Sequence, residues 1–134
     1  MNELRSIDFK NPSGIQLIRA EENTLVIHAD GEDIQFITTQ GAHPFEKLYT
    51  EFNLAEYEIA QLKGIYKKIV INGVEGKGIV LSFESNDSSH DILIPCQHSW
   101  HDYSHGFLEL SVVKGEESII DEMDITVYTK EECY

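Results

Sequence analysis

The chain has 134 residues, of which 41% are hydrophobic, and its 24 acidic and 10 basic residues leave a formal charge of −14. These values are typical of one folded domain (residues 1–134) with a real hydrophobic core, and they exclude a disordered chain. No apolar run approaches the roughly 20 residues of a membrane span, and the negative charge disfavours nucleic acid and anionic lipid as partners.

The N-terminal stretch MNELRSIDFKNPSG lacks the apolar core of a secretory signal. The chain contains two cysteines, Cys96 and Cys133. Two cysteines are too few for a disulfide scaffold and suit a reducing compartment. We therefore expect a cytoplasmic protein, and the sequence leaves open whether the two thiols are reactive or paired.

Alternating apolar residues dominate the first third of the chain. A strand is predicted at Ile15–Ala20, and TLVIHAD (24–30) and EDIQFITT (32–39) alternate on either side of Asp30-Gly31. Both residues of an Asp-Gly pair tolerate positive φ, as a two-residue hairpin turn requires. This part of the sequence predicts a β-hairpin.

One segment has helical spacing instead. Phe45, Leu48, Tyr49 and Phe52 recur at intervals of three and four, and Pro44 suits a first helical turn. We predict a short helix over residues 44–52 with its apolar stripe in the core. Its continuation through 55–59 stays open, because residues 57–59 fit a strand equally well.

A second hairpin is predicted from Tyr66 to Glu84. The strand KKIVI leads into Asn72-Gly73, and IVLSFE follows Gly78. The glycines of the loop between them suggest a phosphate-binding loop, but such a loop is followed by a helix whose N-terminal amides bind the anion. Here a strand follows, so we interpret the loop as a turn.

Further strands are predicted at His90–Pro95, Phe107–Val113 and Asp124–Thr129. The sum is about seven or eight short strands and one short helix, joined by links mostly too short for crossover helices. The predicted fold is mainly β (α+β), an antiparallel β-sandwich or strongly bent sheet. Its edge strands would offer a route to a homodimer.

The stretch CQHSWHDYSH (96–105) suggests a metal site. His98, His101 and His105 are spaced three and four apart, and Cys96 or Asp102 would supply a fourth ligand for zinc or a similar divalent metal. Three histidines with an open position would also suit a metal-dependent hydrolase. Against this hypothesis, the chain has no HExxH and no CxxC.

The same stretch has two other interpretations. Trp100 and Tyr103 have the composition of a protein-recognition hot spot, and their rings would also suit a sugar or small ligand. No residue set for nucleophilic catalysis stands out, because no GxSxG is present and serine beside histidine is not a triad. Enzymatic activity stays open, with binding favoured over catalysis.

Acidic residues are concentrated near the C-terminus, where residues 109–134 contain eight acids and two bases. Apolar residues among such acids would limit dissociation from a basic partner while charge governs the rate of association. We expect the partner-binding residues to include Trp100, Tyr103, Glu116, Glu117, Asp121, Glu122 and Asp124. The alternative is a solvated turn whose apolar residues point inward.

In size and charge alone the chain resembles bacterial immunity proteins and nuclease inhibitors, which are small and acidic. The resemblance implies a cytoplasmic binding module that neutralises a basic, nuclease-like protein. Because the resemblance is not based on any sequence motif, it does not indicate a role for individual residues.

Overall fold

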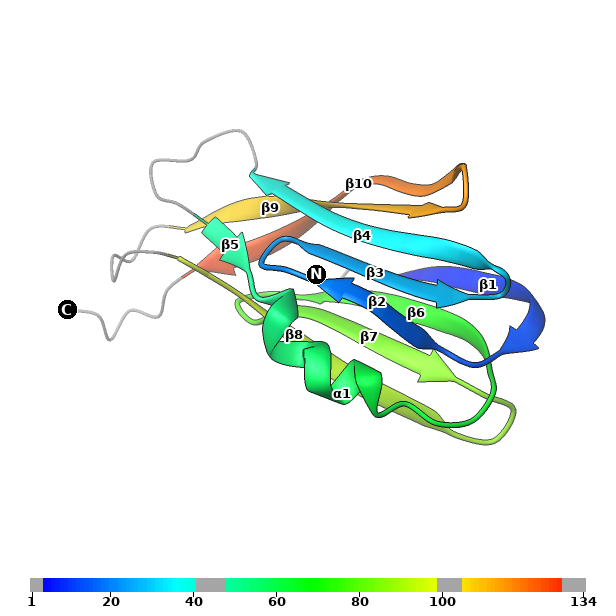
Figure 1. Ribbon diagram of the computed structural model, residues 1–134. Coiled ribbons are helices and arrows are strands. Elements are labelled where there is room, and N and C mark those ends of the chain that lie inside the picture. Colours follow the sequence, from blue (N-terminus) through cyan, green and yellow to red (C-terminus); the bar gives the residue numbers. More distant parts are fainter. Residues whose placement is uncertain (1–3, 41–47, 99–104, 129–134) are drawn as a thin grey trace.

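The computed structural model describes residues 4–40, 48–98 and 105–128. The chain forms two antiparallel five-stranded sheets packed face to face, which confirms the predicted β-sandwich class (Figure 1). The order of strands is β1-β6-β7-β8-β5 in the first sheet and β10-β9-β4-β3-β2 in the second. The strands are β1 (Leu4–Ser13), β2 (Gln16–Ala20), β3 (Thr24–Ala29), β4 (Glu32–Gln40), β5 (Leu48–Thr50), β6 (Tyr66–Val74), β7 (Gly78–Glu84), β8 (Ser89–His98), β9 (His105–Lys114) and β10 (Glu117–Tyr128).

The predicted Asp-Gly hairpin is confirmed as β3 and β4. Asp30 and Gly31 have φ values of 55° and 76°, which is the conformation that a primed two-residue turn requires. Leu25, Ile27 and Ala29 are buried, as their alternation predicts. The pattern of neighbouring residues was therefore sufficient to predict this hairpin.

Inward-facing side chains of both sheets form one hydrophobic core. Alternation assigns them, since successive residues of a strand point to opposite faces. The largest fully buried members include Phe36, Phe52, Phe83, Leu25, Ile27, Ile34, Ile69, Ile71, Ile79 and Leu81.

The predicted helix is misplaced. Residues 48–50 form β5, and the helical segment comes later, as the 3-10 helix η1 (Phe52–Ala55) followed by α1 (Glu56–Ala60). Residues 44–47 lie outside the described residues. Phe52, Ala55 and Ile59 are buried as the apolar stripe predicts, so the spacing identified the core face but the segment was placed too early. No helix in the described ranges is long and apolar enough to cross a bilayer.

The predicted second hairpin is confirmed as β6 and β7, but the sequence predicted too few strands and ended the first strand of that hairpin too early. The described residues contain ten strands, and the two that the sequence did not predict are β1 and the three-residue β5, which have no clear alternation of their own. Strand β6 continues through Asn72-Gly73 to Val74, and the turn follows it. A Cβ at Gly73 would lie 2.7 Å from Ile125 Cδ1, so this glycine allows β10 to pack closely on β6.

Strand β1 connects the two sheets. Its first half pairs with β6, while β2, which follows it, belongs to the second sheet. Between these parts, the backbone N–H groups of Lys10 and Asn11 donate hydrogen bonds to the carboxylate of Asp30 at 2.7 and 3.2 Å. Asp30 thereby fixes the crossing chain to the β3–β4 turn.

Candidate functional site

The predicted acidic segment lies on one hairpin, formed by β9 and β10. The structure places Glu116 in the turn and the other four acids on β10, so most of the segment is strand rather than turn. All five acids are exposed, namely Glu116, Glu117, Asp121, Glu122 and Asp124. The buried side chains of Ile120 and Met123 separate them and attach the strand to the core.

The structure adds a sixth carboxylate to this surface. Glu109 of β9 lies directly opposite Asp124 of β10 in the antiparallel register. Directly opposite side chains share a face of the sheet, and like charges in that position destabilise the pairing. Because β10 is an edge strand of its sheet, this surface is open on one side. We call these six residues on β9 and β10 the acidic hairpin; Glu109 and Asp124 share its outer face, whereas Glu117 lies opposite Lys114.

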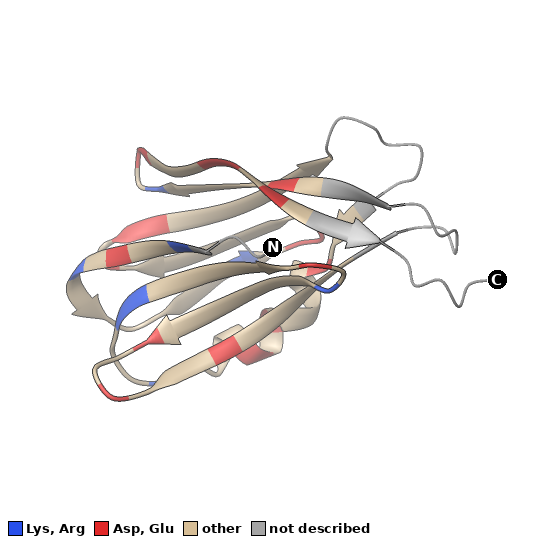
Figure 2. Ribbon diagram, turned by 180° about the vertical axis from the view of Figure 1, so that it is seen from behind, with Lys and Arg blue, Asp and Glu red and all other residues tan. Residues whose placement is uncertain are grey.

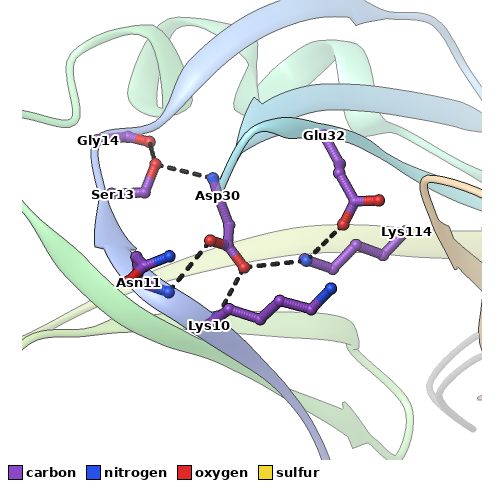
Figure 3. Close-up of polar contacts among 7 residues, drawn as sticks. All are labelled: Lys10, Asn11, Ser13, Gly14, Asp30, Glu32 and Lys114. Atoms are coloured by element: carbon purple, nitrogen blue, oxygen red, sulfur yellow. Dashed lines mark hydrogen bonds and ion pairs between the residues drawn. The ribbon is translucent and has the colours of Figure 1, made fainter.

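The hairpin has one basic residue in its described side chains, and that residue points inward. Lys114 continues the buried series Leu108, Leu110 and Val112 on β9, and its side chain is only 5% exposed. Its Nζ lies 3.0 Å from Asp30 Oδ2 and 2.8 Å from Glu32 Oε2 (Figure 3). The ammonium is therefore neutralised inside the molecule and leaves the exterior acidic.

Asp30 makes the most polar contacts of the three residues that meet at the Lys114 ammonium. In addition to Lys114 and the two backbone N–H groups of β1, its own backbone N–H donates to Ser13 Oγ at 2.8 Å (Figure 3). Burial alone would raise the pKa of the Asp30 carboxyl, but the backbone N–H of Lys10, the Lys114 ammonium and the N–H of Asn11 together lower it. The carboxylate is thus held ionised. We call Asp30, Glu32 and Lys114 the Lys114 cluster.

The pKa values of the other two members are also shifted so that the charged form is favoured. Burial alone would lower the pKa of Lys114, but its hydrogen bonds and charge interactions with Glu32 and Asp30 raise it. The hydrogen bond from Lys114 lowers the pKa of Glu32. All three groups are therefore charged near neutral pH, and the cluster is a structural ion-pair network at the end of the sandwich.

Acidic residues also occur elsewhere on the surface: the helical segment after β5 contains Glu51, Glu56 and Glu58 without a lysine or arginine, whereas the other long hairpin mixes acids with bases. The β6–β7 hairpin (66–84) contains three lysines and two glutamates, and Lys68 Nζ lies 3.8 Å from Glu84 Oε1. On the acidic hairpin, red positions recur along β10 in Figure 2, and β9 contributes Glu109. The two hairpins have similar lengths, so the difference between them lies in composition and in the inward turn of Lys114.

The predicted metal site is mostly outside the described residues. Trp100, His101 and Tyr103 fall there, while His98 ends β8 and His105 begins β9, with side chains that are likewise undescribed. The metal hypothesis and the recognition hypothesis for this stretch therefore stay predictions. Within the described ranges, no group of three or more His, Cys, Asp or Glu side chains could hold a metal ion.

Two neighbours of the histidine stretch are placed. His90 lies eight residues before His98 on the same strand, roughly 26 Å away in an extended chain, so it cannot join a common site. Cys96 faces the core, with Sγ 3.9 Å from Thr50 Oγ1, and burial raises the pKa of its thiol to about 12. The Cys96 thiol is therefore neither a ready nucleophile nor a ready metal ligand.

Sequence reasoning missed the roles of Lys114 and Glu109. The alternation of residues 108–114 does place Lys114 on the inward face and Glu109 on the outward face. Alternation could not identify the carboxylates that pair with the Lys114 ammonium, because Glu32 is 82 positions distant in the chain. Comparison with known proteins adds no assignment: no family model, curated protein or solved structure matches this chain.

Proposed function

We propose that this protein is a small cytoplasmic binding module that neutralises a basic protein through the acidic hairpin, in the manner of an immunity protein or nuclease inhibitor. The observation that carries the proposal is the inward turn of Lys114. It leaves six carboxylates on one hairpin without an exposed base among the described side chains.

The arrangement has a local energetic cost. The opposition of Glu109 and Asp124 weakens the β9–β10 pairing, and acidic side chains at an edge strand repel one another when no cation lies between them. A basic partner would relieve that repulsion on binding. Local conflicts of this kind are expected where a surface serves binding rather than stability.

The expected effect is primarily kinetic. A surface field of one sign raises association rates by about 10- to 1000-fold, and the gain disappears as salt shortens the screening length to about 8 Å at physiological ionic strength. Partly buried apolar residues beside the acids, such as Val113 and Ile119, would contribute to the lifetime of the complex.

The proposal is tested by capture of partners from the native host. A variant with Glu117→Gln, Asp121→Asn, Glu122→Gln and Asp124→Asn removes four charges of the acidic hairpin. Its matched control, with Glu56→Gln, Glu58→Gln, Glu75→Gln and Asp87→Asn, changes the net charge equally at exposed positions elsewhere. We expect a basic protein to be captured by the native chain and the control but lost by the hairpin variant, with stronger capture at low salt.

Four results would oppose the proposal. Equal weakening of capture in both variants would show that net charge alone acts, and unchanged capture in both would show that these charges are not used. If no specific partner is captured at any of several salt concentrations, the proposal that a basic protein binds this surface is refuted. Aggregation of the hairpin variant with no change in capture would assign the acids to protection of the β10 edge.

A further inference from the structure

A hollow of about 430 Å³ opens at the end of the second sheet, away from the Lys114 cluster. Its lining comes from the β2–β3 turn, the end of β4, β5 and the start of β9. The lining residues are Glu22, Asn23, Thr38, Thr39, Gln40, Tyr49 and Leu108. We call it the β4–β5 hollow, and its volume lies in the usual range of small-ligand sites.

The walls of the hollow are fixed by main-chain hydrogen bonds. The N–H of Thr38 donates to the carbonyl of Asn23 at 3.0 Å, and the N–H of Phe52 donates to the carbonyl of Glu22 at 3.3 Å. The β2–β3 turn is thus bonded to β4 on one side and to the start of η1 on the other. A ligand would meet a preformed wall, which reduces the entropic cost of binding.

Among the described residues, the lining offers hydrogen-bond acceptors and no positive charge. Within the described residues, the Glu22 carboxylate and the hydroxyls of Thr39 and Tyr49 make no hydrogen bond or ion pair. The ring of Tyr49 adds apolar surface, while Leu108 beside it is almost fully buried. Such a lining disfavours anions and fits a cationic group on a short apolar stem, because the methylenes contact apolar surface while the charge meets acceptors.

The hollow adjoins the acidic hairpin. Thr39, which lines it, lies directly opposite Glu109 on β9, and Glu109 lies directly opposite Asp124 on β10. Adjacent strands are about 4.8 Å apart and directly opposite side chains share a face. One row across the sheet therefore leads from the hollow to two carboxylates of the hairpin within roughly 10 Å.

We propose that the β4–β5 hollow receives a lysine or arginine side chain of the basic partner, with its charge on Glu22 and its stem against the ring of Tyr49. This inference rests on the proposed function and adds a specific anchor to it: the acidic hairpin attracts the partner, and the hollow holds one of its cationic side chains. Buried anchors of this kind contribute most of the binding energy in many interfaces.

The test is a ¹⁵N NMR titration of the whole chain with N-acetyl-argininamide. N-acetyl-citrullinamide, a neutral molecule of nearly the same shape, is the matched ligand control. We expect saturable shifts at the amides of Asn23, Thr39, Gln40 and Tyr49 with the arginine derivative. Glu22→Gln should weaken its binding about fivefold, and Asp87→Asn, an equal change of charge in the β7–β8 turn, should leave it unchanged.

Shifts that do not saturate, equal binding of the citrulline derivative, or equal weakening by Asp87→Asn would each overturn the inference. Partner capture separates it from the proposed function. If Glu22→Gln and Tyr49→Phe leave capture intact while the hairpin variant abolishes it, the hollow is not the anchor and the acidic hairpin remains the binding surface. If the arginine derivative binds but the hairpin variant captures normally, the proposed function fails and the cation site remains.

Discussion

Replacing Lys114 by methionine tests the Lys114 cluster most directly. The change keeps an unbranched apolar stem of similar length but removes the ammonium that lies 3.0 Å from the Asp30 carboxylate. Asp30 then stays in a site where its side chain is only 4% exposed, with two backbone N–H donors and no cation. We expect a marked loss of stability with the fold retained.

Removing one partner of a buried ion pair costs about 3–5 kcal/mol. The lower end applies here, because Asp30 keeps its backbone donors and the cluster lies at the end of the sandwich rather than in its centre. We therefore expect a loss of about 3 kcal/mol at pH 7. With a urea slope of about 1.5 kcal/mol/M, the unfolding midpoint should fall by about 2 M.

The assay is equilibrium urea unfolding of Lys114→Met, Asp30→Asn and the double variant. Asparagine tolerates the positive φ of position 30, so the second change removes charge with little backbone strain. The double variant should recover at least about 1 kcal/mol relative to additivity, because the unpaired charge is gone. Lys68→Met, which alters the half-exposed pair with Glu84, is the control and should cost under about 1 kcal/mol. A loss at Lys114 no larger than at Lys68, or an additive double variant, would refute this reasoning.

The remaining predictions concern pH, packing and thiol reactivity. The two carboxyls of the Lys114 cluster have lowered pKa values in the folded state. Their contribution to the free energy of unfolding is therefore complete above the unfolded pKa near 4 and is lost as the pH falls below it. The difference in stability between the native chain and Lys114→Met, measured by urea unfolding, should be smaller at pH 3 than at pH 7, and an equal difference at both pH values would contradict this. Gly73→Ala should cost about 1 kcal/mol, because its Cβ would overlap Cδ1 at the end of the buried Ile125 side chain, which must then shift. Gly14→Ala, whose Cβ would make an ordinary contact at 3.6 Å, should have little effect in thermal unfolding, and equal losses would refute the packing argument. In a Cys133→Ser background, Cys96 should react with a thiol reagent at pH 8 only as fast as the protein opens, because its side chain is buried and burial also raises the pKa of its thiol to about 12. Rapid labelling of the native state would show an accessible thiolate.

Local sequence determined a large part of this fold. The alternation in residues 24–39 and 79–83 assigned the buried side chains, and Asp30-Gly31 fixed a turn, because these features depend only on residues adjacent in the chain. The acidic excess of the C-terminal region was equally plain. The misplaced helix shows the limit of such reasoning, since Leu48 and Tyr49 fit a helical stripe yet pair with β8 as strand β5.

Tertiary structure decided which surfaces those elements present. Lys114 loses its exposed charge only because the β3–β4 turn brings Asp30 and Glu32 to its ammonium, and the β4–β5 hollow exists only where the β2–β3 turn, β4, β5 and β9 meet. Both depend on pairings between residues far apart in the sequence, whose free energy comes from burial and from ion pairs made only in the assembled sandwich. The sequence by itself determined how much charge the hairpin contains, and the folded chain determined which of it faces a partner.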